Sequence, residues 1–390
     1  MKIPLLDLKA QYQSIKEEIN SKVLDLFSSQ NFILGSEVAE LEKDLAAYSG
    51  TRFAVGVSSG SDALIVSLMA LGVKNGDAVL TTPFTFFATV GAIARLGARV
   101  VFCDIGRTTY NMSPESLEQV LEKEMGSQKS AQIKAIIPIH LYGQCADMDP
   151  IMDLSHKYQI PVVEDAAQSI GSEYPSSSGV KRACGMGDLG ILSFFPSKNM
   201  GGYGDGGMVL TNNQDLAEKL KVLRVHGAKN KYFHEIIGGN FRLDAIQAAV
   251  LRVKFKYLDN WLQKRKDNAA LYDRLFQESG LLDKKCIILP EPVYKMSGIQ
   301  NYHTYNQYVI RANSRDELQN FLKEKGIGTA IYYPLALHLQ ACFAYLGYLK
   351  GDFPESEKAS EEVLALPVYP ELSEEQQEYI VASIKEFYSK

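Results

Sequence analysis

The sequence is poor in cysteine and has no CxxC pair. Its five cysteines are scattered and odd in number: Cys103, Cys145, Cys184, Cys286 and Cys342. This spacing indicates neither a zinc site nor a disulfide framework. Reduced thiols in the cytoplasm fit such a pattern best.

Long runs of one residue type are also missing. Basic residues number 41 and acidic residues 46, which gives a net charge of −5 without a long run of either sign. Nucleic acid and anionic membranes are therefore not expected as partners. No apolar run approaches the roughly 18 residues that a transmembrane helix needs. The N-terminal MKIPLLDLKAQYQSIKEEI turns polar and helical too soon for a signal peptide, so we expect a cytoplasmic protein.

The length and the hydrophobic pattern predict an α/β protein of two domains. The 390 residues are too many for one ordinary core, and 46% of them are hydrophobic. From about 50 to 215, strand-like runs alternate with helix-like runs, which is typical of a mostly parallel sheet with helices on both faces. The expected strands are Phe53–Val57, Ala78–Thr81, Arg99–Cys103, Ala135–Ile139, Pro161–Val163, Ile191–Phe195 and Met208–Thr211. Only about a dozen residues join the last two strands, so these two are expected to be antiparallel.

The C-terminal part predicts a smaller α/β unit. One long helix from Arg242 to about Gln277 is expected as the bridge into it. Beyond about 280, the expected strands are Cys286–Leu289, Tyr305–Ile310 and Thr329–Tyr332, with helices near 314–325 and 373–387. We therefore predict a large domain over residues 1–250, which includes a helix near 11–29, and a small domain over residues 251–390.

The most informative stretch runs from Gly190 to Asn213 and holds a single lysine, Lys198. Strand-like runs flank the segment SFFPSKNMGGYGDGG. The segment cannot be helical, because its glycines are close together and Pro196 lacks a backbone donor. A lysine therefore lies on a tight connection at the ends of two strands, where the glycines allow a ligand to approach the backbone.

Acidic residues follow another buried strand. Glu164, Asp165 and then Gln168 come directly after Pro161–Val163, and α/β proteins bind ligands at the carboxyl ends of their strands. A lysine that forms a Schiff base, with an acid to hold a pyridinium nitrogen, is the pair that pyridoxal 5′-phosphate (PLP) requires. The two motifs together indicate PLP chemistry.

Motifs along essentially the whole chain resemble the DegT-type nucleotide-sugar aminotransferases, which are fold-type-I PLP enzymes. They are SGSDAL (59–64), FTFFAT (84–89), HLYGQCADMD (140–149), EDAAQSIG (164–171), SFFPSKN (193–199), GGYGDGG (201–207), GGNFRLDAIQAAVL (238–251) and LPVYPEL (366–372). The resemblance implies a seven-stranded, mostly parallel sheet in the large domain. It also implies a transaminase that moves an amino group from an amino acid, L-glutamate, to a nucleotide-linked keto sugar. The product would serve amino-sugar synthesis for surface polysaccharide, lipid A or a glycosylated metabolite.

The resemblance also gives roles to single residues. Lys198 is expected to carry PLP and to act as the base that moves the substrate proton. Asp165 is expected on the pyridinium nitrogen and Gln168 beside the phenolic oxygen. Phe86 matches the aromatic residue that stacks on the ring.

The PLP phosphate is expected at the start of the helix Asp62–Leu71. Gly60 and Ser61 open this helix, whose free N–H groups suit a phosphate. Ser193 is expected to point to the same place by resemblance.

Four further residues are implied in substrate binding and assembly. Asn240 and Arg242 match positions that reach into the site of a partner subunit, the Asn toward the phosphate and the Arg toward the substrate. This implies an obligate homodimer with shared sites. Tyr332 and Tyr333, in AIYYPLALH, align with a segment that lines the sugar site, where related members commonly have a histidine–tyrosine pair.

The same residues have other interpretations. Asp165 or Ser61 could be a plain helix N-cap, and Arg242 could be a surface residue at a helix start. The motifs at 140 and 238 favour a UDP- or dTDP-linked 3-keto sugar, with amination at C4 of a 4-keto-6-deoxy sugar as the alternative. A PLP-dependent sugar dehydratase would have histidine in place of Lys198, and a non-catalytic regulatory protein would have lost Lys198, Asp165 or Gln168.

Overall fold

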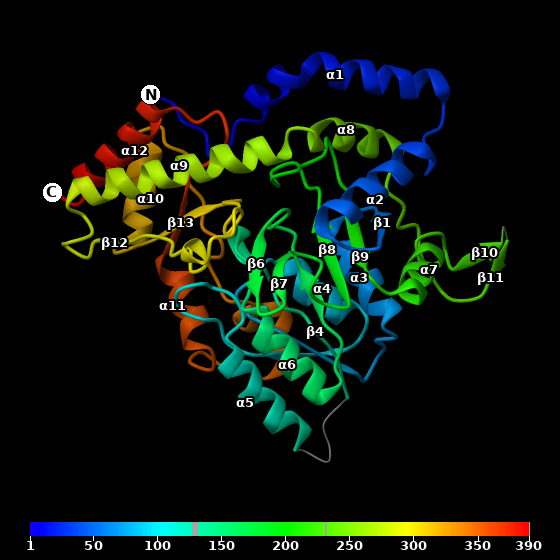
Figure 1. The fold of residues 1–390 in the computed structure, drawn as a ribbon. Coiled ribbons are helices and arrows are strands. Elements are labelled where there is room, and N and C mark those ends of the chain that lie inside the picture. The colour runs from blue at the N-terminus through cyan, green and yellow to red at the C-terminus, as the bar shows by residue number, and fades with distance from the viewer. Residues whose placement is uncertain (127–131, 231, 390) are drawn as a thin grey trace.

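The computed structural model describes residues 1–126, 132–230 and 232–389. The strands are β1 (Phe53–Val57), β2 (Ala78–Thr81), β3 (Arg99–Phe102), β4 (Ile133–Ile136), β5 (Val163–Asp165), β6 (Glu173–Ser176), β7 (Gly179–Arg182), β8 (Leu189–Ser193), β9 (Gly207–Thr211), β10 (Ala228–Asn230), β11 (Phe233–His234), β12 (Ile287–Ile288), β13 (Tyr308–Ala312) and β14 (Val363–Leu366). The helices are α1 (Leu8–Ser29), α2 (Ser36–Ser49), α3 (Gly60–Ala70), α4 (Phe87–Arg95), α5 (Pro114–Met125), α6 (Met148–Tyr158), α7 (Gln214–Leu223), α8 (Ala245–Phe255), α9 (Leu258–Ser279), α10 (Arg315–Glu324), α11 (Pro354–Glu362) and α12 (Glu374–Phe387). Figure 1 shows their arrangement.

The large sheet is mostly parallel, as the sequence predicts. A four-stranded unit, β1-β9-β8-β5, and a three-stranded unit, β3-β2-β4, are joined by bridges from Ile136 to Val162 and from Ile139 to Asp165. Strand β2 is parallel to β3 and β4, and β5 is parallel to β8. Strand β9 runs antiparallel to β1 and β8, which confirms the predicted antiparallel pair.

Helices cover both faces of this sheet because alternate strand residues point in opposite directions. On β2, Leu80 belongs to the buried cluster that includes residues of α2, α5, α6 and α8, whereas its neighbour Val79 belongs to the cluster that includes residues of α3, α4 and α7. The near-continuous apolar strands are typical of a parallel sheet buried on two sides. The predicted three-layer arrangement is therefore confirmed.

The C-terminal part has its own sheet and its own apolar cluster. The antiparallel sheet β12-β13-β14 packs with α9, α10 and α12. The predicted strand at Thr329–Tyr332 is wrong: Ala330 makes only an isolated bridge to Ala365, and β14 supplies the third strand. The division of the chain after residue 250 stays a prediction, and that position falls within α8.

The expected single helix from Arg242 to Gln277 is also wrong. Arg242 bridges to Val57 and Asp244 to Ile33, so this segment is extended and the helix begins only at Ala245. The path then breaks at Lys256 and Tyr257, between α8 and α9. The short extended segment lies beside the end of β1, which matters for the site described below.

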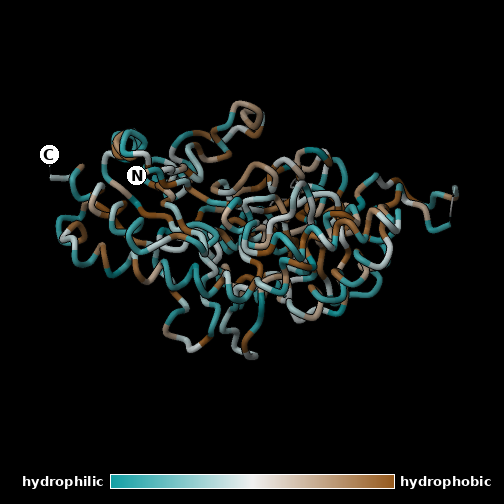
Figure 2. Tube along the Cα trace, turned by 90° about the horizontal axis from the view of Figure 1, so that it is seen from above, coloured by the Kyte–Doolittle hydropathy of each residue, from teal (hydrophilic) through white to brown (hydrophobic). Residues whose placement is uncertain are grey.

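The described part of the chain holds no helix that combines the length and the apolarity needed to cross a membrane. Both termini lie at the same end of the molecule in Figures 1 and 2, and the β10–β11 hairpin projects at the opposite end.

Candidate active site

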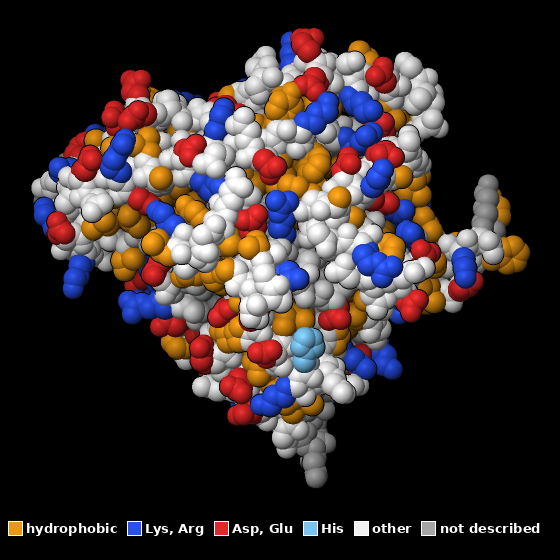
Figure 3. Space-filling view, viewed as in Figure 1, with side chains coloured by type: hydrophobic (Ala, Val, Ile, Leu, Met, Phe, Trp, Pro, Cys, Tyr) orange, Lys and Arg blue, Asp and Glu red, His pale blue; other side chains and the backbone are white. Residues whose placement is uncertain are grey.

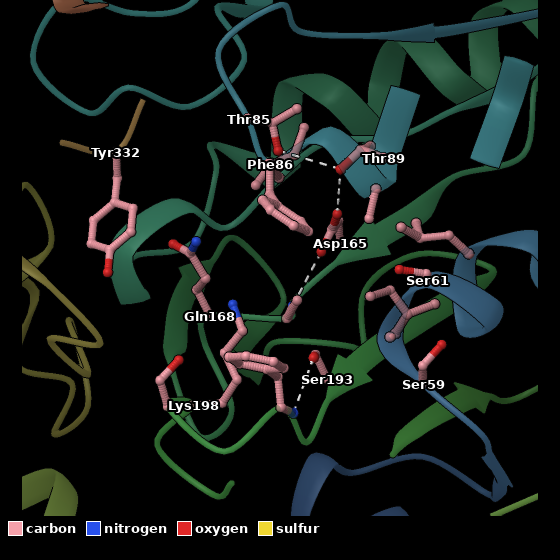
Figure 4. A pocket seen from close by; sticks show the side chains of 18 of the residues that line it. Ser59, Ser61, Thr85, Phe86, Thr89, Asp165, Gln168, Ser193, Lys198 and Tyr332 are labelled. Atoms are coloured by element: carbon pink, nitrogen blue, oxygen red, sulfur yellow. Dashed lines mark hydrogen bonds between the residues drawn. The ribbon is translucent and has the colours of Figure 1, made fainter. Parts of the chain in front are cut away.

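A pocket of about 480 Å³ lies where β1, β5 and β8 end. It brings together most of the site residues that the sequence predicts: Gly60, Ser61, Phe86, Asp165, Gln168, Ser193, Lys198, Tyr332 and Tyr333. Figure 4 shows how the side chains of Ser61, Phe86, Asp165, Gln168, Ser193, Lys198 and Tyr332 converge from separate strands and loops. The pocket is therefore a product of the sheet topology, which places the carboxyl ends of distant segments together.

Lys198 lies on the turn that follows β8. Its backbone N–H donates to the Phe195 carbonyl at 2.8 Å, and its half-buried side chain points into the space between Gln168 and Asp165. Burial lowers the pKa of Lys198 to about 8, against the opposing attraction of Asp165. Within the described residues, its Nζ has no hydrogen-bond or ion-pair partner. An amine with a lowered pKa and no partner is suited to nucleophilic chemistry.

Asp165 ends β5 and is buried. Its Oδ2 accepts from the Thr89 hydroxyl at 2.8 Å, and its Oδ1 accepts from the Ala167 N–H at 3.2 Å. Burial raises the pKa of Asp165, while Thr89, Ala167 and Lys198 oppose that shift. Turns rather than a helix follow Asp165, so the N-cap interpretation does not apply. This carboxylate is held for a partner inside the pocket.

Gln168 is fixed at both ends of its amide. Its Oε1 accepts from the Tyr142 N–H at 2.7 Å, and its Nε2 donates to the Tyr333 hydroxyl at 3.0 Å. The hydroxyl of Tyr142 in turn donates to the Tyr332 carbonyl. These bonds join the segment after β5 to Tyr332 and Tyr333 in the C-terminal part. The pocket is therefore lined by residues from both the N-terminal and the C-terminal parts of the chain.

The N-terminus of α3 faces the pocket with its first residues free. Ser59 is the N-cap and accepts from the Asp62 N–H at 3.0 Å, so Ser61 does not cap the helix. Gly60 lies against Ser193, and a Cβ on Gly60 would come within 2.6 Å of the Ser193 Cβ. Glycine is thus required for this close approach, and the N–H groups of Gly60 and Ser61 remain available to an anion.

Sequence reasoning missed several residues that support the site. Thr89, which holds Asp165, lies one helical turn after Phe86 in the FTFFAT motif, and that spacing could have indicated it. Thr85 lies 3.3 Å from Thr89 between hydroxyl oxygens. Beneath Asp165, the buried pair His140 and Glu164 is joined at 2.9 Å between Nε2 and Oε2. The sequence places Glu164 at this strand end and His140 in the HLYGQCADMD motif, but no local signal shows that the two are paired.

Asn240 and Arg242 do not line the pocket that holds Lys198. They lie in a neighbouring cavity of about 390 Å³ together with Asp244 and Gln247, and Asp205 lines both cavities. The Nε of Arg242 is buried without a hydrogen-bond partner. The predicted contact of these two residues with a site in a second subunit stays a prediction.

Residues 13–385 match the model of the DegT/DnrJ/EryC1/StrS aminotransferase family. The chain belongs to this family. It is 49% identical over 389 residues to the pleiotropic regulatory protein of Geobacillus stearothermophilus, covering 100% of this chain and 99% of that relative. It is 38% identical over 370 residues to the UDP-2-acetamido-2-deoxy-3-oxo-D-glucuronate aminotransferase of Pseudomonas aeruginosa, covering 95% and 96%.

Solved structures show the same fold. The crystal structure of NtdA from Bacillus subtilis with bound cofactor PMP superposes on this family member with a TM-score of 0.88. The two are 28% identical in sequence, and the match covers 100% of this chain and 86% of the other. The predicted fold-type-I aminotransferase architecture is confirmed.

The residues of the pocket fit a pyridoxal phosphate. The unpartnered amine of Lys198 and the buried carboxylate of Asp165 suit the two ends of a pyridine aldehyde. The first turn of α3, kept open by Gly60, suits the phosphate. Phe86 is 56% exposed although it lines the pocket, so its ring is free to cover another ring.

Proposed function

We propose that this family member is a PLP-dependent transaminase that moves an amino group from L-glutamate to a nucleotide-linked keto sugar. One observation carries the proposal: the Lys198 amine, its pKa lowered to about 8 by burial, shares a pocket with the buried carboxylate of Asp165. The family match over residues 13–385 supports the reaction class.

The residues that would hold PLP are those that line the pocket. All of the following residues line the pocket: Gly60, Ser61 and Ser193 would bind the phosphate, Phe86 would cover the ring, and Gln168 would lie beside the phenolic oxygen. When bound, PLP supplies a ring that draws electrons away from the carbon next to the substrate nitrogen.

The chain's own residues then manage the protons. Asp165, held by Thr89, keeps a proton on the ring nitrogen because a carboxylate stabilises the protonated form. Lys198 would move a proton between the substrate carbon and the carbon on the other side of the nitrogen, and its lowered pKa suits an amine that accepts and donates a proton near neutral pH. Tyr332 and Tyr333 line the pocket, and we assign the sugar to their side of it.

We further propose a 3-keto sugar carried by UDP or dTDP, in a pathway that makes amino sugars for surface glycans. The Pseudomonas aeruginosa relative is named for a UDP-linked 3-oxo sugar, which supports this position. Amination at C4 is the alternative. The Geobacillus stearothermophilus relative is named a regulatory protein, but a protein that had lost catalysis would not need an unpaired, half-buried lysine in one pocket with Asp165.

A homodimer with shared sites is part of the proposal. The β10–β11 hairpin projects from the body (Figures 1 and 3), and Asn240 bridges to Val225, three residues before the hairpin begins. Apolar side chains on and after it are exposed, and Ile237 is 90% exposed. A second copy would cover this surface and bring Arg242 to its neighbour's pocket. We also propose a cytoplasmic location, where the exposed thiol of Cys342 stays reduced.

The proposal is tested by a screen of UDP- and dTDP-linked 3-keto and 4-keto sugars with glutamate as donor. Release of 2-oxoglutarate is measured, and the absorbance of the bound cofactor is followed as glutamate is added. We expect a change in absorbance with glutamate alone and turnover with a 3-keto sugar. A protein that binds added PLP but whose absorbance responds to no amino acid would contradict the proposal.

A further inference from the structure

Lys254, on α8, is a buried cation without a carboxylate partner among the described residues. Its side chain is 1% exposed. Its Nζ donates to the Gly201 carbonyl at 2.6 Å and lies 4.4 Å from the centre of the Tyr203 ring. Burying a charge is costly unless strong contacts compensate, and an apolar residue would fill this space at lower cost. The ammonium therefore points to a function for its contact with the glycine-rich segment.

Gln247 holds the other end of the same segment. Its Oε1 accepts from the Tyr203 N–H at 2.8 Å, and a Cβ on Gly204 would lie 2.7 Å from its Nε2. Gln247 and Lys254 are seven residues apart, about two helical turns, so both project from one face of α8. Helix α8 thus contacts the segment 201–204 through two side chains, Lys254 and Gln247.

The segment 201–204 supports the turn that carries Lys198. A Cβ on Gly201 would lie 2.2 Å from the Pro196 carbonyl oxygen, so the two backbones are in direct contact. The Gly202 N–H donates to the Phe194 carbonyl at 2.7 Å, and Lys198 donates to Phe195 in the same turn. A displacement of Gly201 would therefore move the backbone from which the Lys198 amine projects.

We propose that Lys254 and Gln247 are positioning residues that set the place of the Lys198 amine in the pocket. The inference rests on the proposed role of Lys198. Helix α8 would then support the Lys198 turn, and it also directly follows the extended segment that holds Asn240 and Arg242. The glycines of this run thus allow close approach of two side chains of α8, as well as of a ligand.

The test compares Lys254→Met with Lys266→Met in the cofactor-loaded, full-length protein. Lys266 is a matched control: it is 6% exposed and donates to the Gln300 carbonyl at 2.9 Å and to the Asn301 Oδ1 at 3.0 Å, but it lies on α9 and, among the described residues, makes no hydrogen bond to the glycine-rich segment. Burial lowers the pKa of both lysines. The measurements are the midpoint of thermal unfolding, the pH titration of the cofactor absorbance band, and kcat/KM for the amino donor.

We expect both variants to unfold at a lower temperature. Only Lys254→Met is expected to shift the pH titration of the band and to lower kcat/KM, about tenfold to a hundredfold, since misplacement by about 1 Å has such an effect. Gln247→Leu removes only the hydrogen bond with the Tyr203 N–H and is expected to act in the same direction. It replaces Lys254→Met in the test if that variant does not fold.

Equal titrations and equal kcat/KM in the two lysine variants, with Gln247→Leu like wild type, would overturn the inference. Failure of the proposed function looks different, because the wild-type protein would then show no absorbance band that responds to glutamate.

Discussion

Asp165→Asn tests the site most sharply, because the structure implies opposite effects on stability and activity. Both hydrogen bonds of Asp165 survive the change: the amide oxygen can accept from the Ala167 N–H, and the amide nitrogen can donate to Thr89. The Thr89 hydroxyl can then turn its own proton to Thr85, 3.3 Å away. The variant therefore loses a buried charge without leaving a polar group unpaired.

The sign of the stability effect follows from the pKa of Asp165, which burial raises above its ordinary value of 3.8. A raised carboxyl pKa contributes stability that is complete below the unfolded pKa and is lost as the pH rises through the folded pKa. A tenfold difference in proton affinity between the folded and unfolded chain corresponds to about 1.4 kcal/mol. Cofactor-free Asp165→Asn has no such loss, so it should match the wild type near pH 4 and exceed it at pH 8.

Activity should change the other way. A hydrogen bond to a charged group contributes roughly 1.5–3 kcal/mol, and a neutral amide gives up most of that toward the ring nitrogen. Since about 1.4 kcal/mol is a factor of ten, both half-reactions should slow about tenfold to a hundredfold. Stopped-flow absorbance measures each half-reaction, and thermal unfolding between pH 4 and 8 measures stability.

Glu164→Gln is the matched control one residue away. Glu164 accepts from the N–H groups of Cys184, Met186 and Gly187 as well as from His140. A single amide oxygen cannot serve all of these donors, so this variant should be less stable than wild type at neutral pH. A cofactor-free Asp165→Asn that is less stable than wild type at pH 8, or whose glutamate half-reaction is unchanged, would refute the reasoning.

Three other variants test separate parts of the site. Lys198→Ala should lower turnover by several orders of magnitude while PLP still binds through its phosphate, and near-normal turnover would rule out the PLP assignment. Arg242→Ala should lower kcat/KM about a hundredfold with normal cofactor absorbance. Mixed with Lys198→Ala subunits it should regain up to about a quarter of wild-type activity, since half of randomly paired dimers carry one intact site; exchange without recovery would disprove shared sites. Gly60→Ala should weaken PLP binding, measured by titration, because its Cβ would meet Ser193 at 2.6 Å.

The sequence by itself determined the large sheet and most of the pocket. Apolar runs of four or five residues bounded by glycine and proline form buried strands in few other arrangements than a sheet covered on both faces. Strands β8 and β9 had to be antiparallel because too few residues join them for a crossover. The sequence could place Lys198 and Asp165 in one pocket because both follow strand ends, and both residues line that pocket.

Only the tertiary structure decided the rest, because it depends on contacts between distant segments. Pairing with Val57 keeps Arg242 extended, although its sequence reads as the start of a helix. Strand β14 took the place predicted for Thr329–Tyr332 because β13 pairs with it along four residues. The hydrogen bond from Lys254 to the Gly201 carbonyl joins residues 53 positions apart. No local pattern could show that a lysine on an apolar helix face is buried against the loop that carries Lys198.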